Sequence, residues 1–199
     1  MKQRFITHLL VGIALLPLTT VQAAAVSFIL PDASTNAGES VNVDVQISDF
    51  VNVGGFQFSI EWDSSVFQFS SVQDFDHGGA AGTLSFFGPP GNPNSVNVND
   101  AANGKISVLW DHPAQDVALA DGSRLFSITF NAVGAAGSST TLAFSDDPTS
   151  RAVASFTGNH PDFTSVSGSL TIVPEPRWVV GGFALGAMVI VRLLRRKEA

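Results

Sequence analysis

Apolar and polar residues alternate along most of this chain with a period of two residues. The clearest stretch is 41–48, where Val and Ile at the odd positions alternate with Asn, Asp, Gln and Ser. The segments 56–62 and 106–110 repeat the pattern with Phe, Ile, Val and Trp on the apolar side. This period is typical of β-strands with one buried face. Further strands are predicted at 26–30, 66–72, 126–130, 142–144 and 170–172.

Turn-forming residues separate these segments. They include Gly54-Gly55, Asn103-Gly104 and Asp121-Gly122, pairs that favour tight turns. No helical period is sustained between residues 26 and 172. Eight or nine short strands at this spacing predict an all-β sandwich. The 16 Phe and the absence of Tyr suit a core of rings that need no buried hydroxyl partner.

One stretch of this region, 78–95, is rich in Gly and Pro and is interpreted as a long surface loop, with a candidate short strand at 83–87. Phe86 and Phe87 in this loop are candidate binding residues. The alternative is that the two rings fix the loop to the core.

The N-terminus has the three parts of an export signal. Lys2 and Arg4 precede an apolar run, Leu9–Leu16, that is too short to span a bilayer. Small residues follow, and cleavage after Ala23 or Ala25 is predicted. Residues 1–25 are therefore expected to be a signal peptide, the alternative being an uncleaved N-terminal anchor.

The C-terminus carries a second apolar segment, which runs from 178 to 194 with Arg192 as its first charge. It is short for a bilayer of about 30 Å and spans only if Arg192 reaches the interface. The basic residues behind it indicate a cytoplasmic end and an exported body; they are Arg192, Arg195, Arg196 and Lys197.

A rigid motif, Pro174-Glu175-Pro176, stands directly before this segment. Together, residues 173–199 resemble the PEP-CTERM sorting signal of Gram-negative bacteria. The resemblance implies recognition and cutting by a membrane protease, the exosortase, with a precursor held transiently in the inner membrane. It also implies deposition at the cell surface or in an exopolysaccharide matrix. Hydrophobicity alone would equally fit a plain single-pass anchor.

The region between the two targeting segments is strongly acidic. It keeps three basic residues against 15 carboxylates, a net charge of −12. Nucleic-acid binding is excluded on this ground, because it rests on Lys and Arg contacts to phosphate. The chain has no Cys, which excludes a thiol nucleophile and fits an exported domain stabilised by its core alone.

The strand pattern of residues 26–172 is similar to that of the cohesin family. The stretch from Thr35 to Val45, with Gly38-Glu39-Ser40-Val41, resembles the entry to an early cohesin strand. The stretch from Val53 to Val66 resembles the next strand, which ends in an aromatic-Asp turn at Trp62-Asp63. This resemblance implies a jelly-roll sandwich of nine strands that binds dockerin modules through one sheet face. The polar faces of 41–48, 55–62 and 104–110 are the expected contact surface.

No catalytic constellation emerges from the sequence. His77, His112 and His160 lie beside or near Asp, but at expected loop positions, and no hydrolase motif accompanies them. Glu61 and Asp63 share the polar phase of one strand, as a glycosidase pair would, yet Trp62 between them belongs to the apolar phase.

Bound calcium is a weaker expectation than no cofactor at all. Hard oxygen donors cluster at three places, none of which forms an EF-hand: Asp74 with Asp76; Asn97 with Asn99 and Asp100; and Asp146 with Asp147.

The sequence therefore predicts an exported, non-catalytic protein that acts by binding or assembly with a surface or matrix protein. The alternative is binding of exopolysaccharide, which needs exposed aromatic rings. Its candidates are Phe67, Phe69, Phe86 and Phe87.

Overall fold

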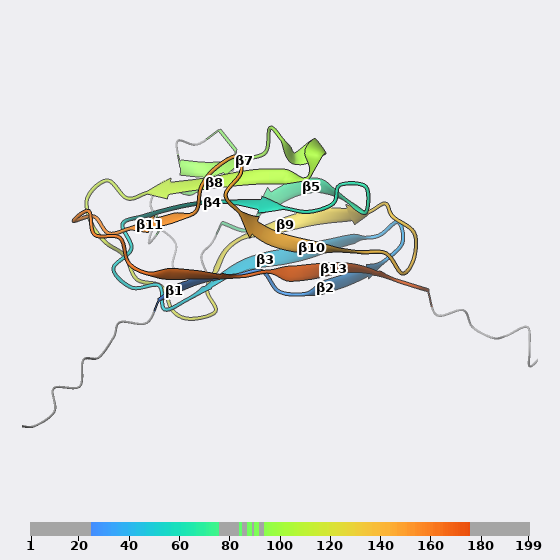
Figure 1. Cartoon of the computed structure of the whole chain (residues 1–199), viewed down its shortest axis with the longest axis horizontal. Helices are drawn as coiled ribbons and strands as arrows, with labels where there is room; N and C mark the ends of the chain where they lie inside the picture. The colour runs from blue at the N-terminus through green and yellow to red at the C-terminus, as the bar shows by residue number, and fades with distance from the viewer. Residues whose placement is uncertain (1–24, 76–83, 85–86, 89, 92–93, 176–199) are drawn as a thin grey trace, which may run out of the picture.

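The computed structural model describes residues 25–75, 84, 87–88, 90–91 and 94–175. Within them the chain forms two β-sheets that pack face to face as a sandwich (Figure 1). The first sheet has the order β12-β1-β3-β9-β5, and the second β2-β13-β10-β4-β8-β7-β6, with β11 also paired to β4. The strands are β1 (Val26–Ile29), β2 (Ala33–Asn36), β3 (Ser40–Ser48), β4 (Gly55–Glu61), β5 (Phe67–Gln73), β6 (Phe87–Gly88), β7 (Asn94–Asn97), β8 (Lys105–Asp111), β9 (Arg124–Ala132), β10 (Ser139–Ser145), β11 (Ala152–Ala154), β12 (Phe163–Val166) and β13 (Gly168–Val173).

The predicted all-β sandwich is confirmed. More strands are labelled than the eight or nine predicted, because several strand paths are interrupted. Three pairs of consecutive strands each form one path. The paths β1–β2 and β12–β13 cross from one sheet to the other, and the path β10–β11 is interrupted by an outward loop. With each pair taken as one path, and the two-residue β6 set apart, nine strand paths remain among the described residues. A short 3-10 helix, η2 (Ala101–Asn103), precedes β8.

The apolar phase of the alternation forms the core. Val43, Val45 and Ile47 of β3 are fully buried, as are Ile106, Val108 and Trp110 of β8. Rings dominate the centre, where the centroids of Phe28 and Phe58 lie 5.1 Å apart. Trp62 Nε1 donates to the backbone carbonyl of Phe67 at 2.8 Å, and no buried polar atom of an aromatic ring in the described residues lacks a hydrogen-bond partner.

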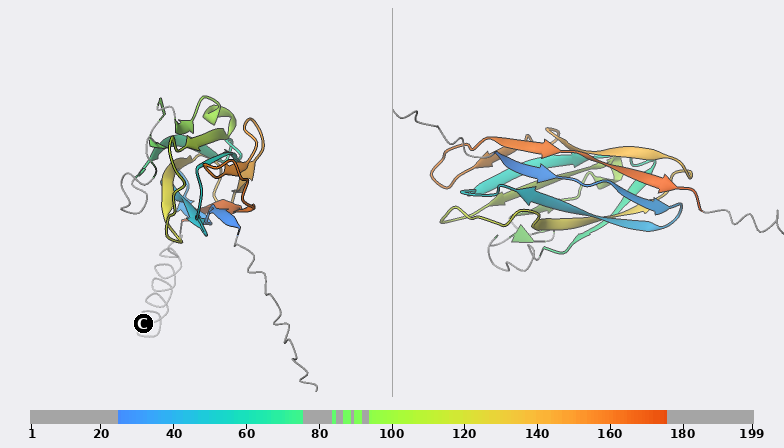
Figure 2. Two further views of the ribbon diagram at one scale, coloured as in Figure 1. Left: turned by 90° about the vertical axis from the view of Figure 1, so that its left-hand side faces the viewer. Right: turned by 90° about the horizontal axis from the view of Figure 1, so that it is seen from below.

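Two parallel pairings join the ends of the described chain. β1 pairs with β12 and β2 with β13, both in parallel, so blue and orange strands lie side by side in the view from below (Figure 2). Both paths change sheets at the same level, between β1 and β2 and at Ser167, between β12 and the first residue of β13, Gly168. As a result β1 begins near one end of the sandwich and β13 finishes at the other (Figure 1).

Gly168 is required at this crossing by close backbone approach. A Cβ atom built there would lie 2.5 Å from the carbonyl oxygen of Leu30 and closer still to that of Pro31. The neighbouring Ser169 fixes the same place, since its backbone N–H and hydroxyl both donate to Asp32 Oδ1, each at 2.8 Å.

We expect Gly168→Ala to destabilise the fold by about 1–3 kcal/mol, because the added methyl group displaces backbone and not a flexible side chain. Thermal or urea unfolding measures the loss. Ser167→Ala, one residue away at an exposed position, is the matched control and should unfold like the unchanged protein. Equal stability of both variants would contradict the close approach.

Candidate functional site

The outward surface of β11, β4, β8 and β7, which we call the β4–β8 face, is the most distinctive surface of the described structure. The register of the strands determines which residues lie side by side on this face. Gly55 stands between Ala154 and Asp111, and Gln57 stands between Ala152 and Leu109. Farther along, Ser59 faces Ser145 and Ser107, and Glu61 faces Lys105. The face thus has small residues and the Asp111 carboxylate at one end, and hydroxyl and charged groups at the other.

Leu109 stands at the centre of this face. It is 47% exposed although its neighbours on β8, Val108 and Trp110, are fully buried. Beside it lies an open hollow of about 420 Å³, lined mainly by small or backbone groups and by Leu109 itself: Gly55, Phe56, Gln57, Leu109, Trp110, Asp111, Ala152 and Ala154. An exposed aliphatic side chain next to an apolar hollow is the arrangement of a protein-contact anchor.

A second groove, of about 610 Å³, lies on the other side of Leu109. Half of its lining residues carry an amide or hydroxyl group, including Gln57, Asn97, Ser107 and Thr149. Hydroxyl and amide groups at such positions can donate and accept hydrogen bonds to a partner's backbone. Leu109 therefore separates an apolar hollow from a polar groove.

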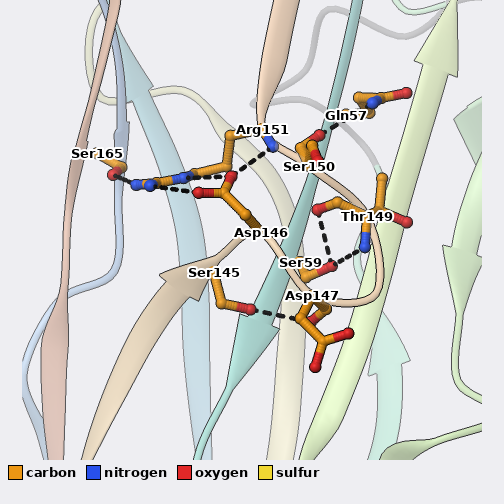
Figure 3. Close-up of polar contacts among 9 residues, drawn as sticks. All are labelled: Gln57, Ser59, Ser145, Asp146, Asp147, Thr149, Ser150, Arg151 and Ser165. Atoms are coloured by element: carbon orange, nitrogen blue, oxygen red, sulfur yellow. Dashed lines mark hydrogen bonds and ion pairs between the residues drawn. The ribbon is translucent and has the colours of Figure 1, made fainter.

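The wall of the polar groove comes from residues 146–151, which we call the flap. It interrupts the strand path that pairs with β4, so that β10 pairs with residues 59–61 and β11 with residues 55–57. The flap lies across β4 and reaches β8 (Figures 1 and 3). Ser59, fully buried beneath it, accepts from Thr149 N at 2.9 Å and donates to Thr149 O at 3.1 Å.

Further bonds fix the flap on both sides. Gln57 Nε2 donates to Ser150 O at 2.9 Å, and Ser145 Oγ donates to Asp147 O at 3.0 Å. Lys105 of β8 forms an ion pair with Asp147, and this hydrogen bond raises the pKa of Lys105. The groove wall is therefore held by the strands that it covers.

The base of the flap is closed by a charge-assisted pair. Arg151 donates to both carboxylate oxygens of Asp146, from Nε at 3.0 Å and from Nη2 at 2.9 Å, while its Nη1 donates to Ser165 Oγ at 2.9 Å (Figure 3). The side-chain and backbone hydrogen bonds from Arg151 lower the pKa of Asp146 to about 2. Bidentate geometry of this kind fixes orientation as well as charge.

The opposite face of the sandwich is different, because its polar side chains bond to one another. Across β3 and β9, Ser40 donates to Asn131, Thr129 to Asn42 and Ser127 to Asp44, over 2.8, 2.7 and 2.5 Å. Segment 41–48, expected to share a contact surface with 55–62 and 104–110, thus lies in the other sheet. That part of the expectation is wrong, since period-2 alternation assigns a strand's faces but not its sheet.

The aromatic candidates for binding are also corrected. Phe87 is 7% exposed, and its ring contacts Phe56, Phe75 and Phe126. Phe67 is fully buried, and Phe69 is partly buried against the core and near Trp62. Phe86 lies outside the described residues. These three described rings therefore pack against the core.

The groups considered for catalysis have structural roles. His112 is buried, and its Nδ1 accepts from Ala114 N and Gln115 N, both at 3.1 Å. Asp63 accepts from the backbone N–H and hydroxyl of Ser65, which lower its pKa. Trp62 between Glu61 and Asp63 points into the core. His160 approaches Val153 O at 3.4 Å, while His77 lies outside the described part.

The oxygen donors considered for calcium are likewise engaged. Asp146 binds Arg151, Asp147 binds Lys105, and Asn97 Oδ1 accepts from Asn99 N at 3.0 Å. Among residues 25–75 and 94–175 and the few described between them, no three His, Asp or Glu side chains are grouped as metal ligands. Asp76, the proposed companion of Asp74, is not among them.

Most of the two targeting segments falls outside the described residues, including Ala23, Pro176 and the basic residues from Arg192 to Lys197. Ala25, Pro174 and Glu175 are described and lie in non-regular structure at the ends of the sandwich. No helix in the described part is long and apolar enough to cross a membrane; the segment 178–194 is not in that part.

Sequence reasoning missed Leu109 and the flap. The signal for Leu109 was present, because it is the one apolar residue in the polar phase of 105–111. The flap carries no comparable signal, since Asp146-Asp147-Pro148 is an ordinary turn sequence.

The comparisons with known proteins agree with this architecture. Residues 26–155 match the cohesin domain, and the chain belongs to the cohesin domain family. Cohesin domains are non-catalytic protein-binding modules, which confirms the expectation of a non-enzyme. No protein among curated sequences matches the chain.

Solved structures show the same fold. The cohesin CaCohA2 of Clostridium acetobutylicum, solved in complex with a dockerin, is 25% identical; the match covers 75% of this chain and all of that one, with a TM-score of 0.59. The OlpA cohesin of Clostridium thermocellum, also in a dockerin complex, is 19% identical, with coverages of 75% and 100% and a TM-score of 0.59. A non-cellulosomal cohesin of Archaeoglobus fulgidus is 15% identical, with coverages of 77% and 94% and a TM-score of 0.56.

Acid should loosen the flap through Asp146. Its carboxyl has a lowered pKa in the folded protein, so the stabilisation is fully present above the unfolded value of about 4. It is lost as the pH falls through that value towards 2. Hydrogen exchange of the flap amides, measured between pH 5 and pH 2 and expressed as protection relative to the intrinsic exchange rate at each pH, should show protection that falls on acidification.

Asp146→Asn should show fast exchange already at pH 5 and a weaker pH dependence in this window. Asp63→Asn is the control, because Asp63 also has a lowered pKa but bonds Ser65 instead of the flap. If the two variants left flap exchange equally unchanged, the Asp146–Arg151 pair would not hold the flap.

Proposed function

We propose that this protein is an exported cohesin module whose β4–β8 face binds a dockerin-bearing protein. The observation that carries the choice of face is the exposed Leu109, which stands between an apolar hollow and a polar groove. A partner helix or loop laid across β4 and β8 would bury Leu109 and place its own polar groups over the groove. Central aliphatic contact with a polar rim is the usual anatomy of such interfaces.

The opposite face supports this choice by contrast. There, the side chains of β3 and β9 already satisfy one another's hydrogen bonds in successive rows. A partner on that surface would have to break those bonds or leave them unused, and would find no exposed aliphatic centre. Polar groups that are already paired gain little from a new partner.

The negative charge of the domain favours a partner with cationic side chains. The region from 26 to 173 has a net charge of −12, and Asp111 and Asp147 border the face. A partner with cationic side chains at the rim would associate faster and more selectively than a neutral one.

We also propose that the chain is sorted through its ends. Export by residues 1–25 and removal of the tail beyond the Pro174-Glu175-Pro176 motif would release or attach the sandwich at the cell surface or in a polysaccharide matrix. Support comes from the order of motif, apolar segment and basic residues at 173–199. The exposed positions of Pro174 and Glu175 just after β13 are consistent with access by a processing enzyme.

Leu109→Asp tests the proposed face. Proteins captured by the unchanged chain from its host's secreted fraction would be identified by mass spectrometry, and one bearing dockerin repeats would be purified and titrated by calorimetry. We expect the variant to bind at least about tenfold more weakly, a loss of about 1.4 kcal/mol, because a buried carboxylate would replace the aliphatic anchor.

Val133→Asp is the matched control, since Val133 is 45% exposed but lies in the loop after β9. Unchanged affinity of the Leu109 variant would reject this face. Capture of exopolysaccharide in place of a dockerin-bearing protein would favour the carbohydrate alternative.

Sorting is tested by the intact mass of the protein recovered from its native host. Loss of residues 1–23 or 1–25 together with loss of the residues beyond about 173 is the expected result. A mass that retains 178–199 would instead identify a plain membrane anchor.

A further inference from the structure

Phe156 is the single aromatic side chain among the strongly exposed large apolar residues of the described structure. It is 54% exposed, whereas the aromatic residues of the strands are directed to the core. It belongs to the turn 155–158 that follows β11. An exposed ring of this size leaves a large apolar area in water, and burial of that area by a partner would be favourable.

The turn that carries Phe156 is tightly bonded. Gly158 N donates to Ser155 O at 2.9 Å, and Ser155 N donates to Asn159 O at 2.8 Å. The hydroxyls of Ser155 and Thr157 lie 2.8 Å apart, and Asn159 donates from its backbone N to Ser155 Oγ and from Nδ2 to Thr157 Oγ1. These bonds fix the backbone on both sides of the ring, so little conformational entropy remains to be lost when a partner covers it.

The turn is also fixed to the end of the β4–β8 face. Phe156 N donates to Asp116 Oδ1, and Gly54 N donates to Ala154 O at 2.8 Å. A Cβ atom at Gly54 would lie 2.8 Å from the carbonyl carbon of Ser155 and closer still to Phe156 N. The backbone of the turn therefore rests directly on Gly54, one residue before the row in which Gly55 lies between Ala154 and the carboxylate-bearing Asp111.

We infer that Phe156 is a preorganised aromatic anchor that extends the β4–β8 face beyond the strands and contacts an apolar side chain of the same partner protein. The inference rests on the proposed function. Continuity supports it, because Ala152, Ala154 and Gly55 line the hollow beside Leu109 and lead to the turn. Leu109 and Phe156 thus stand at the two ends of one strip of small residues, with the carboxylate of Asp111 beside Gly55.

The polar groups of the turn favour a protein over a sugar as the occupant. Carbohydrate sites combine a ring with side chains that are free to bond hydroxyl groups. Here the hydroxyls of Ser155 and Thr157 and the amide of Asn159 are used within the turn itself. The ring is then presented with apolar neighbours on the side of the hollow.

Photo-crosslinking in the native host tests this inference on the full chain. The probe is p-benzoylphenylalanine, placed at position 156, 109 or 166 in separate strains. Position 166 is the control, since Val166 is 50% exposed on β12 in the other sheet. We expect positions 109 and 156 to capture the same protein and position 166 to capture none of it.

Each outcome has a distinct meaning. Capture from position 109 without capture from 156 would overturn the anchor and leave the proposed face intact. Capture from neither would overturn both. Equal capture from 156 and 166 would show unselective surface contact and would also overturn the anchor.

Two substitutions measure the contribution with the captured protein. Phe156→Ala should weaken its binding by about tenfold or more, as a hot-spot residue does. Gly54→Ala keeps the ring but displaces the turn, and should weaken binding while Val166→Ala does not. Unchanged affinity of Phe156→Ala, in protein that unfolds at the normal temperature, would contradict the inference.

Discussion

The cluster of aromatic rings between the two sheets is the contact on which the rest of the structure depends. Phe28 of β1 lies 5.1 Å from Phe58 and 5.5 Å from Phe56 of β4, and Phe58 lies 5.2 Å from Phe144 of β10. Trp110 of β8 stacks on Phe56 at 5.3 Å. These rings join strands of both sheets, and burying each contributes a few kcal/mol. Because these rings fill the space between the sheets, the outward positions of the same strands hold mainly small and polar residues.

The β4–β8 face is shaped by an interruption in the strand path next to β4. Where β10 ends and β11 has not begun, the flap rises over β4 and is fixed by Ser59, Gln57 and the Asp146–Arg151 pair. The flap covers part of the face, and its Thr149 lines the polar groove, which Leu109 separates from the hollow. A continuous strand would have left a flat sheet instead, with less relief for a partner to fit.

The two faces of the sandwich show why exposure of polar groups alone does not identify a binding surface. On β3 and β9 the outward hydroxyl, amide and carboxylate groups form cross-strand pairs, which stabilise the sheet and leave a saturated surface. On β4 and β8 the corresponding positions hold an exposed Leu, small residues and groups that support the flap. The two faces therefore differ because of the strands that lie beside each other on them. The alternating sequence pattern is the same for both faces.

The sequence by itself determined the strands, their buried phase and the class of fold, because alternation of apolar and polar residues depends only on local backbone geometry. The segments 41–48, 56–62 and 106–110 were predicted within a residue or two. The resemblance of 26–172 to cohesins also identified the family. Only the tertiary structure decided that 41–48 lies in the other sheet, that Phe67 and Phe87 face inward, and that the small residues of β4 and β11 lie beside Leu109 and Phe156. Those facts depend on which strands become neighbours and what lies across them, and these long-range contacts leave no local pattern in the chain.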